Sequence, residues 1–158
     1  MAKMNNINII IDDDIATSSI TDNISTTFYI DYLGKCFPDN QWSDLTFPVL
    51  NMWAVKLMGN ISSSNSKFRL YFMDGPFWLD VTKNGQNLMI ECVNGRSERL
   101  VEYVIECSCF DFLNSLYDAT KKLSYILYFN GMHIGAFESV YNQTLSDIKH
   151  LKALIRVC

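Results

Sequence analysis

Apolar and polar residues alternate along two segments in the middle of the chain, residues 67–73 and 77–83. In the first segment, Phe68, Leu70 and Phe72 fall on one side. A period of two is typical of a strand with one buried face, so the pattern predicts two such strands. The Asp-Gly-Pro run at 74–76 predicts a turn between them.

A hairpin is predicted at Asn84 and Gly85, directly after the second of these strands. Both central residues of a type I′ turn need positive φ, which Asn-Gly tolerates best. This turn sets three apolar pairs across the strands: Val81 with Leu88, Leu79 with Ile90, and Phe77 with Cys92. The same tight turn at 94–95 would oppose Glu91 to Glu98, so we expect a longer or bulged connection before a strand at 100–106.

The first third of the chain is less regular. The β-branched stretch 8–11 predicts an edge strand, and the Ser/Thr/Asn-rich stretch 17–27 predicts turns or loop. Aromatic and β-branched residues at 27–33 predict a strand. Residues 42–59 are interpreted as a long, bent strand, although Pro48 would deny a central strand one ladder hydrogen bond and residues 52–58 fit a helix as well as a strand. Residues 60–65, mostly Ser and Asn, predict a loop.

Helical signals dominate after residue 107. Ser108 and Asp111 have the spacing of a capping box, with Asp in place of the usual Glu. Apolar residues then recur at helical spacing up to an Asn-Gly stop at 130–131, and a second helix is predicted at 138–156. Strands first and helices last predict an α+β fold, an antiparallel sheet of about five or six strands followed by two C-terminal helices packed on one face.

Length and composition fit a single globular domain over residues 1–158, with residues 1–27 irregular or an edge strand. The hydrophobic fraction of 49% is ample for one core. The net charge of −4 argues against a nucleic-acid binder and against docking on an anionic membrane, because both need basic patches. No run approaches the ~18 apolar residues of a membrane span, and no export signal is visible. The five cysteines are therefore interpreted as reduced thiols, and the protein is predicted to be cytoplasmic.

Residues that could carry catalysis are few. His133 is predicted between the two helices and His150 on the second, and neither lies in a recognised motif. Cys107 and Cys109 lack a second half-site with zinc-like spacing, and the flanking carboxylates disfavour a thiolate. The chain contains no glycine-rich phosphate loop. We therefore predict no catalytic residue, no cofactor and no metal site, and a protein that is not an enzyme.

Acidic and aromatic residues predict a surface that binds another molecule. The run of three Asp residues at 12–14 is either a solvated turn or a concentration of negative charge that a cation or a basic protein would offset. Trp42 is a candidate for exposure, and Trp78 alternates to the face opposite Phe77, where it is either covered or an interaction anchor. Asp80 on that face would give the patch acidic character. The predicted partner contacts are Asp12, Asp13, Asp14, Trp78 and Asp80.

Three short motifs carry a resemblance to a known family. They are FPDNQWSD at 37–44, VLNMW at 49–53 and FMDGPF at 72–77, and the similar region spans about 37–129. The chain resembles immunity proteins of bacterial contact-dependent growth inhibition systems, which are encoded beside polymorphic toxins. The resemblance implies a non-enzymatic protein that binds the C-terminal domain of its cognate toxin, a nuclease, in the cytoplasm. It further implies a monomer alone and a 1:1 complex with the toxin.

Two other functions remain open. One is a small-molecule-binding or enzymatic α+β domain, with a site on the open sheet face lined by Trp78, Tyr71 and a titratable pair that includes His133. The other is a structural subunit that uses an exposed sheet edge. The motif residues themselves are turn and core types, so they are expected to serve the fold and do not identify toxin contacts.

Overall fold

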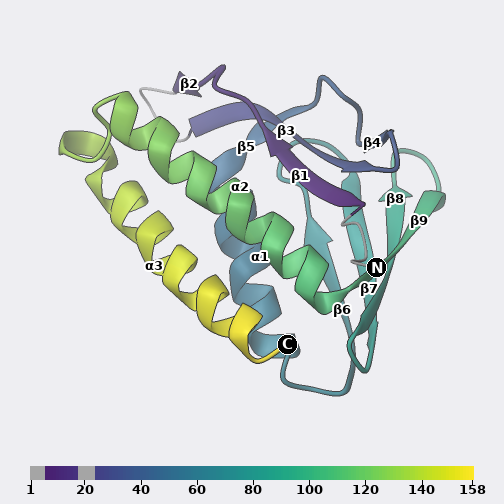
Figure 1. Ribbon diagram of the computed structural model, residues 1–158. Coiled ribbons are helices and arrows are strands. Elements are labelled where there is room, and N and C mark those ends of the chain that lie inside the picture. The colour runs from purple at the N-terminus through teal and green to yellow at the C-terminus, as the bar shows by residue number, and fades with distance from the viewer. Residues whose placement is uncertain (1–5, 18–23) are drawn as a thin grey trace.

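The computed structural model describes residues 6–17 and 24–158, and Figure 1 shows two antiparallel sheets beside a group of helices. The first sheet contains β1 Ile7–Ile11, β2 Ala16–Thr17, β3 Ile24–Tyr32, β4 Lys35–Phe37 and β5 Ser43–Leu45. The second has the order β6-β7-β8-β9, with the bounds Asn65–Tyr71, Phe77–Asn84, Asn87–Asn94 and Leu100–Ser108. The helices are α1 Thr46–Asn60, α2 Cys109–Phe129 and α3 Glu138–Arg156, with a 3₁₀ turn at Gly135–Phe137 before α3.

The α+β class and the two C-terminal helices are confirmed, but the predicted single sheet is wrong. Within the described residues, the strands divide into a five-stranded and a four-stranded sheet, because α1 lies between β5 and β6 along the chain. α1 contacts both sheets, through β3 and β6. α2 packs on β1, and α3 lies mainly against α2 and α1, so the two C-terminal helices do not share one sheet face.

β3 is the centre of the first sheet, since β1, β2, β4 and β5 all pair with it. The predicted edge strand at 8–11 is confirmed as β1, in which alternate isoleucines are buried. β3 starts three residues earlier than predicted, so Ile24–Thr26 are strand and not loop. Residues 18–23, also predicted as loop, lie outside the described residues. After β3, Leu33 (φ 54°) and Gly34 (φ 82°) form the two-residue turn to β4.

The hairpin between β7 and β8 is confirmed, but its predicted register is wrong by two residues. Asn84 pairs with Asn87, so Gly85 (φ 61°) and Gln86 are the central turn residues. A glycine at the first central position suits a type II′ turn, in which the second needs no positive φ. The apolar pairs are therefore Val81 with Ile90 and Leu79 with Cys92, while Phe77 faces Asn94. The shift is an even number of residues, so every side chain stays on its predicted face.

The neighbouring strands also follow the sequence pattern. β6 begins and ends two residues before the predicted 67–73, and the turn at 74–76 is present. Residues 95–99 form the longer connection that was expected between β8 and β9, and the pairing is irregular between Cys92 and Val93. β9 itself starts at the predicted Leu100.

The predicted bent strand at 42–59 is wrong, because most of it forms α1. Pro48 lies in the first turn of this helix, where backbone N–H groups have no intrahelical acceptor, so proline costs nothing there. The buried residues recur at helical and not at strand spacing: Thr46, Val49, Leu50, Trp53, Ala54 and Leu57. Only Ser43–Leu45 are extended, as the short strand β5.

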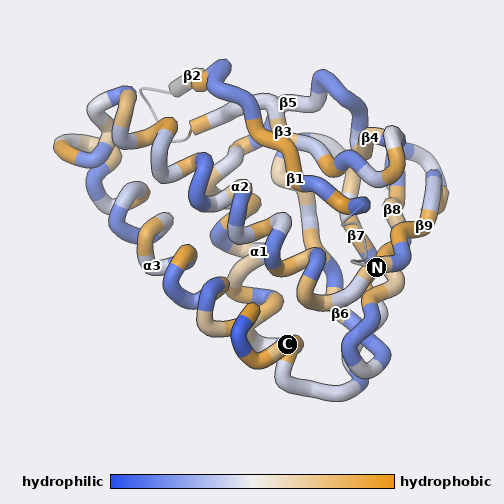
Figure 2. Tube along the Cα trace, in the orientation of Figure 1, coloured by the Kyte–Doolittle hydropathy of each residue, from blue (hydrophilic) through white to orange (hydrophobic). Residues whose placement is uncertain are grey.

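Both C-terminal helices have the predicted limits. The Ser108 hydroxyl accepts a hydrogen bond from the Asp111 amide (3.0 Å) and caps α2, and Gly131 (φ 71°) follows its end. Alternation of hydrophobic and hydrophilic positions along α2 and α3 is visible in Figure 2, and Leu113, Leu116, Leu123 and Leu127 of α2 lie in the core. None of the described helices combines the length and the apolar character needed to cross a membrane.

Candidate functional site

The predicted contact residues fall in two separate regions. Asp12, Asp13 and Asp14 form the bend after β1, the hydrophilic stretch between β1 and β2 in Figure 2. Trp78 and Asp80 lie on β7, in the second sheet, at the right of Figure 1. The structure therefore brings together the residues within each group but does not join the two groups.

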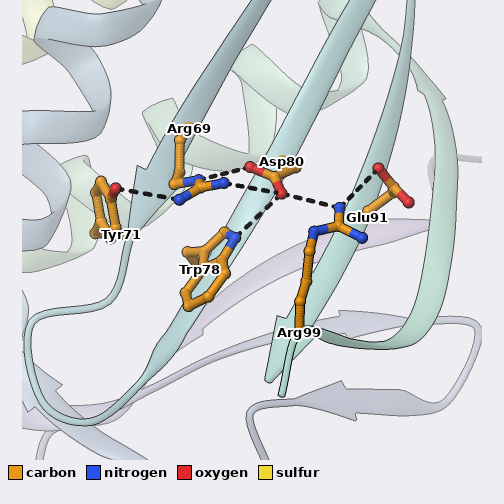
Figure 3. A network of polar contacts seen from close by, with 6 residues as sticks. All are labelled: Arg69, Tyr71, Trp78, Asp80, Glu91 and Arg99. Carbon is orange, nitrogen blue, oxygen red and sulfur yellow. Dashed lines mark hydrogen bonds and ion pairs between the residues drawn. The ribbon is translucent and has the colours of Figure 1, made fainter. Parts of the chain in front are cut away.

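Asp80 is the centre of a polar network on the outer face of the second sheet (Figure 3). Its Oδ1 accepts a hydrogen bond from Arg69 Nε at 2.7 Å. Its Oδ2 accepts from Trp78 Nε1 at 3.1 Å and from Arg99 Nη2 at 3.0 Å. Arg69 stands opposite Asp80 in the β6–β7 register, and Arg99 reaches in from the β8–β9 connection. All three donors thus converge on one half-buried carboxylate.

The network cancels its own charge. Arg99 Nη2 also lies 3.2 Å from Glu91 Oε1, so two guanidinium groups meet two carboxylates. The predicted acidic character of this patch is therefore wrong. The sequence-based prediction of this site included no arginine. The alternation along β6 and β7 could have indicated Arg69, because it puts this residue on the same face as Trp78. Arg99 lies in the β8–β9 connection, where no strand periodicity could have indicated the direction of its side chain.

The network also determines the pKa of Asp80. Partial burial acts to raise the pKa of this carboxyl, but the hydrogen bonds from Arg69, Trp78 and Arg99 outweigh burial and hold it below the ordinary value. The pKa of Arg69 is raised in turn, mainly by its hydrogen bond to Asp80. The Asp80 carboxylate is therefore charged at neutral pH, and both of its oxygens accept hydrogen bonds.

The half-buried indole ring of Trp78 has two close neighbours, Arg69 and Gly95. The Arg69 guanidinium carbon lies 4.7 Å from the ring centroid, within cation–π distance. Gly95 approaches so closely that a Cβ at this position would lie 2.3 Å from Trp78 Cζ3. The prediction left open whether Trp78 is covered or available, and the structure shows a ring that is packed into the surface.

The Asp12–Asp14 bend has a different character. The Asp14 carboxylate accepts hydrogen bonds from the Thr27 amide (2.9 Å) and hydroxyl (2.6 Å), which fix the bend on β3. Slight burial acts to raise the pKa of Asp14, but these Thr27 donors hold it below its ordinary value. Asp12 and Asp13 are exposed, and neither forms an ion pair with any residue that the structure describes.

The motifs that carry the family resemblance meet in one buried cluster. Asp44 Oδ1 accepts hydrogen bonds from the backbone amides of Leu45 (2.7 Å), Met73 (3.1 Å) and Asp74 (3.1 Å). Its Oδ2 accepts from Trp42 Nε1 at 3.0 Å, and the Trp42 ring packs against Phe77 with a centroid distance of 5.0 Å. Trp42 is thus partly buried, with its indole N–H and ring engaged inside the protein, and these motifs connect the two sheets.

The histidines and cysteines do not assemble a reaction centre with Trp78. His133 stacks on Tyr128 at 4.4 Å, away from the face of Trp78 and Tyr71 where the small-molecule alternative places it. Burial raises the pKa of the Cys107 thiol to about 12. Among residues 6–17 and 24–158, no three His, Cys, Asp or Glu side chains are grouped to hold a metal ion.

Known proteins provide no further identification of these surfaces. Comparisons of the chain with protein-family models, with curated protein sequences and with solved structures give no match. Function is therefore argued from the two surface regions and from the resemblance that the three motifs carry.

Proposed function

We propose that this chain is a non-enzymatic immunity protein that binds and neutralises a cognate toxin, a nuclease domain, in the cytoplasm. One copy of the chain binds one toxin domain in this proposal. The resemblance at 37–44, 49–53 and 72–77 supports it. The sequence suggested contacts at the Asp12–Asp14 bend and at Trp78 and Asp80, and the geometry favours the bend, because Asp80 is already paired with Arg69 and Arg99.

The single observation that carries this proposal is the exposed, unpaired carboxylate pair of Asp12 and Asp13. Asp14 anchors the bend to Thr27, which fixes the backbone that carries Asp12 and Asp13. Neither carboxylate forms an ion pair with a described residue, and the whole chain has a net charge of −4. Nucleases bind polyanions through basic surfaces, which an acidic inhibitor approaches rapidly by electrostatic steering.

Co-expression tests the proposal directly. The toxin domain encoded beside this chain is expressed with and without it, and cell survival is measured together with the affinity of the purified pair by calorimetry. We expect survival only in the presence of this chain, and a 1:1 complex. Survival that does not depend on this chain, or purified proteins that do not bind, would contradict the proposal.

Charge reversal then tests the role of the Asp12 and Asp13 carboxylates. The double variant Asp12→Lys/Asp13→Lys is expected to slow association about tenfold or more at low salt, with a smaller effect at high salt. The matched control is Glu98→Lys/Glu102→Lys, which changes the net charge by the same amount at two exposed positions, one in the β8–β9 connection and one on β9. Equal association rates for the double variant and the control would remove Asp12 and Asp13 from the interface.

A further inference from the structure

We infer that the toxin docks on the exposed C-terminal end of α2 together with the Asp12–Asp13 bend, and not on the sheet face that carries Trp78 and Asp80. This inference rests on the proposed function and identifies the surface and the partner chemistry. We call the surface the α2-end patch, which consists of Tyr125, Tyr128, Phe129 and Ile134.

The α2-end patch is made of large, exposed apolar and aromatic side chains. Phe129 is 81% exposed and Ile134 is 65% exposed, and about half of each of the two tyrosine side chains is accessible. Large aromatic side chains gathered on a surface mark interaction sites, and Tyr and Phe are enriched at the centres of protein interfaces. The buried stripe of α2 does not need these residues, since Leu123, Ile126 and Leu127 already fill the core side.

Aromatic contacts hold the patch in shape before any partner binds. Tyr128 stacks on His133 at 4.4 Å and meets Phe129 edge-to-face at 5.8 Å. His133 also meets Tyr141 of α3 at 5.9 Å, so the stack joins the end of α2 to α3. A patch that is already ordered loses little conformational entropy on binding, which favours affinity.

The acidic bend and the patch border one hollow. It has a volume of about 330 Å³ and is lined by Asp13, Lys122, Tyr125, Ile126, Phe129 and Asn130. The Lys122 ammonium donates to the Ile11 carbonyl at 2.6 Å, so one positive charge lies beside the bend and offsets part of its negative charge. Lys121 lies over the Tyr117 ring, at 5.9 Å from its centroid. Asp12 and Asp13 themselves form no ion pair with any described residue and can each accept a partner's cation.

The sheet face is the weaker candidate because its polar groups are already satisfied. Asp80 and Glu91 are paired with Arg69 and Arg99. A partner that covers this network would desolvate four charged groups without offering them new hydrogen bonds, which costs free energy. At the α2 end, by contrast, a partner removes apolar surface from water and supplies countercharge to free carboxylates.

These features specify the partner's chemistry. The complementary surface carries Lys or Arg opposite Asp12 and Asp13, next to an apolar side chain that enters the hollow and packs on Phe129. A basic nuclease domain with an apolar residue at the rim of its substrate site has this composition. Binding there would block the polyanion-binding surface of the toxin.

The test measures the affinity of the purified toxin domain, encoded beside this chain, for full-length variants. Phe129→Ser is expected to weaken binding about 30-fold or more, as for the central aromatic of an interface. Asp13→Lys is expected to weaken it about tenfold. Three substitutions at exposed positions away from the patch serve as controls: Met89→Ser on the sheet face, Leu100→Ser on β9 and Glu98→Lys. The affinity of each control for the toxin domain should stay within about threefold of that of the unmodified protein. Thermal melts check that Phe129→Ser, at an 81% exposed position, remains folded.

The outcomes separate this inference from the proposed function. If the unmodified protein does not bind the toxin domain, the proposed function fails and this inference fails with it. If it binds but Phe129→Ser and Asp13→Lys bind equally well, or if Met89→Ser is the variant that loses affinity, the proposed function stands and the α2-end patch is overturned as the docking surface. Sedimentation equilibrium without toxin gives the remaining check: a dimer that Phe129→Ser dissociates would assign the patch to self-association and overturn the inference.

Discussion

Asp44 shows how one side chain can join distant parts of the chain. Its carboxylate lies before α1 and receives four N–H donors, two of them from the turn between β6 and β7. Burial raises the pKa of Asp44, although these donors favour the charged form. A carboxylate that is buried and fully hydrogen-bonded contributes to stability through the donors that it satisfies.

Asp44→Asn is expected to lower the free energy of unfolding by about 2 kcal/mol at pH 7. The Asn side-chain oxygen can accept the hydrogen bonds that Oδ1 accepts. Its NH₂ group would then face Trp42 Nε1 in place of Oδ2, so the indole N–H loses its acceptor. Urea denaturation measures the difference. Asp74→Asn is the control, since Asp74 contributes its backbone amide to Asp44, and it should change stability by no more than about 0.5 kcal/mol. Equal effects of the two substitutions would contradict this role for Asp44.

Asp80 makes stability depend on pH in the acid range. Its pKa lies below the ordinary 3.8 in the folded protein, so the folded state releases this proton more readily than the unfolded chain. Its contribution is therefore complete above about pH 5 and is lost as the pH falls through 3.8 toward the folded pKa. We expect Asp80→Asn to lower the free energy of unfolding by about 0.5–1 kcal/mol at pH 7 and by progressively less below pH 4. Urea denaturation at a series of pH values measures this difference. A difference that stays constant between pH 7 and pH 2.5 would show that the effect does not come from the charge.

At the scale of elements, α1 separates the two sheets and carries a fully buried Trp53. The Trp53 indole donates to the Tyr71 carbonyl of β6 at 2.8 Å, and its ring meets Phe28 of β3 and Phe72 edge-to-face at 5.5 Å and 5.3 Å. One helical side chain thus bonds to the second sheet and packs against the first. Helical conformation is required for this, because a strand would place neighbouring apolar residues on opposite faces.

Substitution by proline distinguishes a helical α1 from an extended segment. Met52 is exposed in the interior of α1, and Met52→Pro would remove a backbone hydrogen bond and clash with the carbonyl four residues earlier. We expect a loss of about 3 kcal/mol or more in the free energy of unfolding. Met52→Ala should stay within about 0.5 kcal/mol, and circular dichroism with urea denaturation compares the two. Similar stability of both variants would contradict the helix.

At the scale of the whole molecule, α3 is held by a buried carboxylate as well as by apolar packing. Asp147 Oδ2 accepts a hydrogen bond from Asn51 Nδ2 of α1 at 2.7 Å, and Oδ1 accepts from Gln143 Nε2 at 3.0 Å. Of the α3 residues, Thr144, Asp147 and Leu151 are buried. The docking of the last helix therefore depends on a polar contact between residues that are 96 positions apart.

A double-mutant cycle measures this contact. Asn51→Ala and Asp147→Ala are each expected to lower the free energy of unfolding, and the two effects should be coupled by about 1–2 kcal/mol, because each removes the partner of the other. Asp147→Ala combined with Ser108→Ala is the control pair, which should be additive within about 0.5 kcal/mol. Additivity of the Asn51 and Asp147 substitutions would mean that the contact does not stabilise α3.

Local chemistry allowed much of the secondary structure to be predicted. The strands at 67–73 and 77–83, the hairpin after Asn84 and the capped helix after Ser108 each combine a periodic pattern with a turn or cap residue, and all are present. The patterns also placed Trp78 and Asp80 on one face. Period and capping act within a few residues, so a single sequence is enough to recognise them.

The α+β class, most element types and the face on which each side chain of β6–β8 lies can be predicted from local sequence patterns. Four features cannot: the division of the strands into two sheets, the helix at 46–60, the pairing of Asp80 with Arg99, and the position of Asp13 beside an aromatic patch. Each of these depends on contacts between residues far apart along the chain. Such contacts are set by how complete elements pack together, and periodicity within one segment carries no information about them.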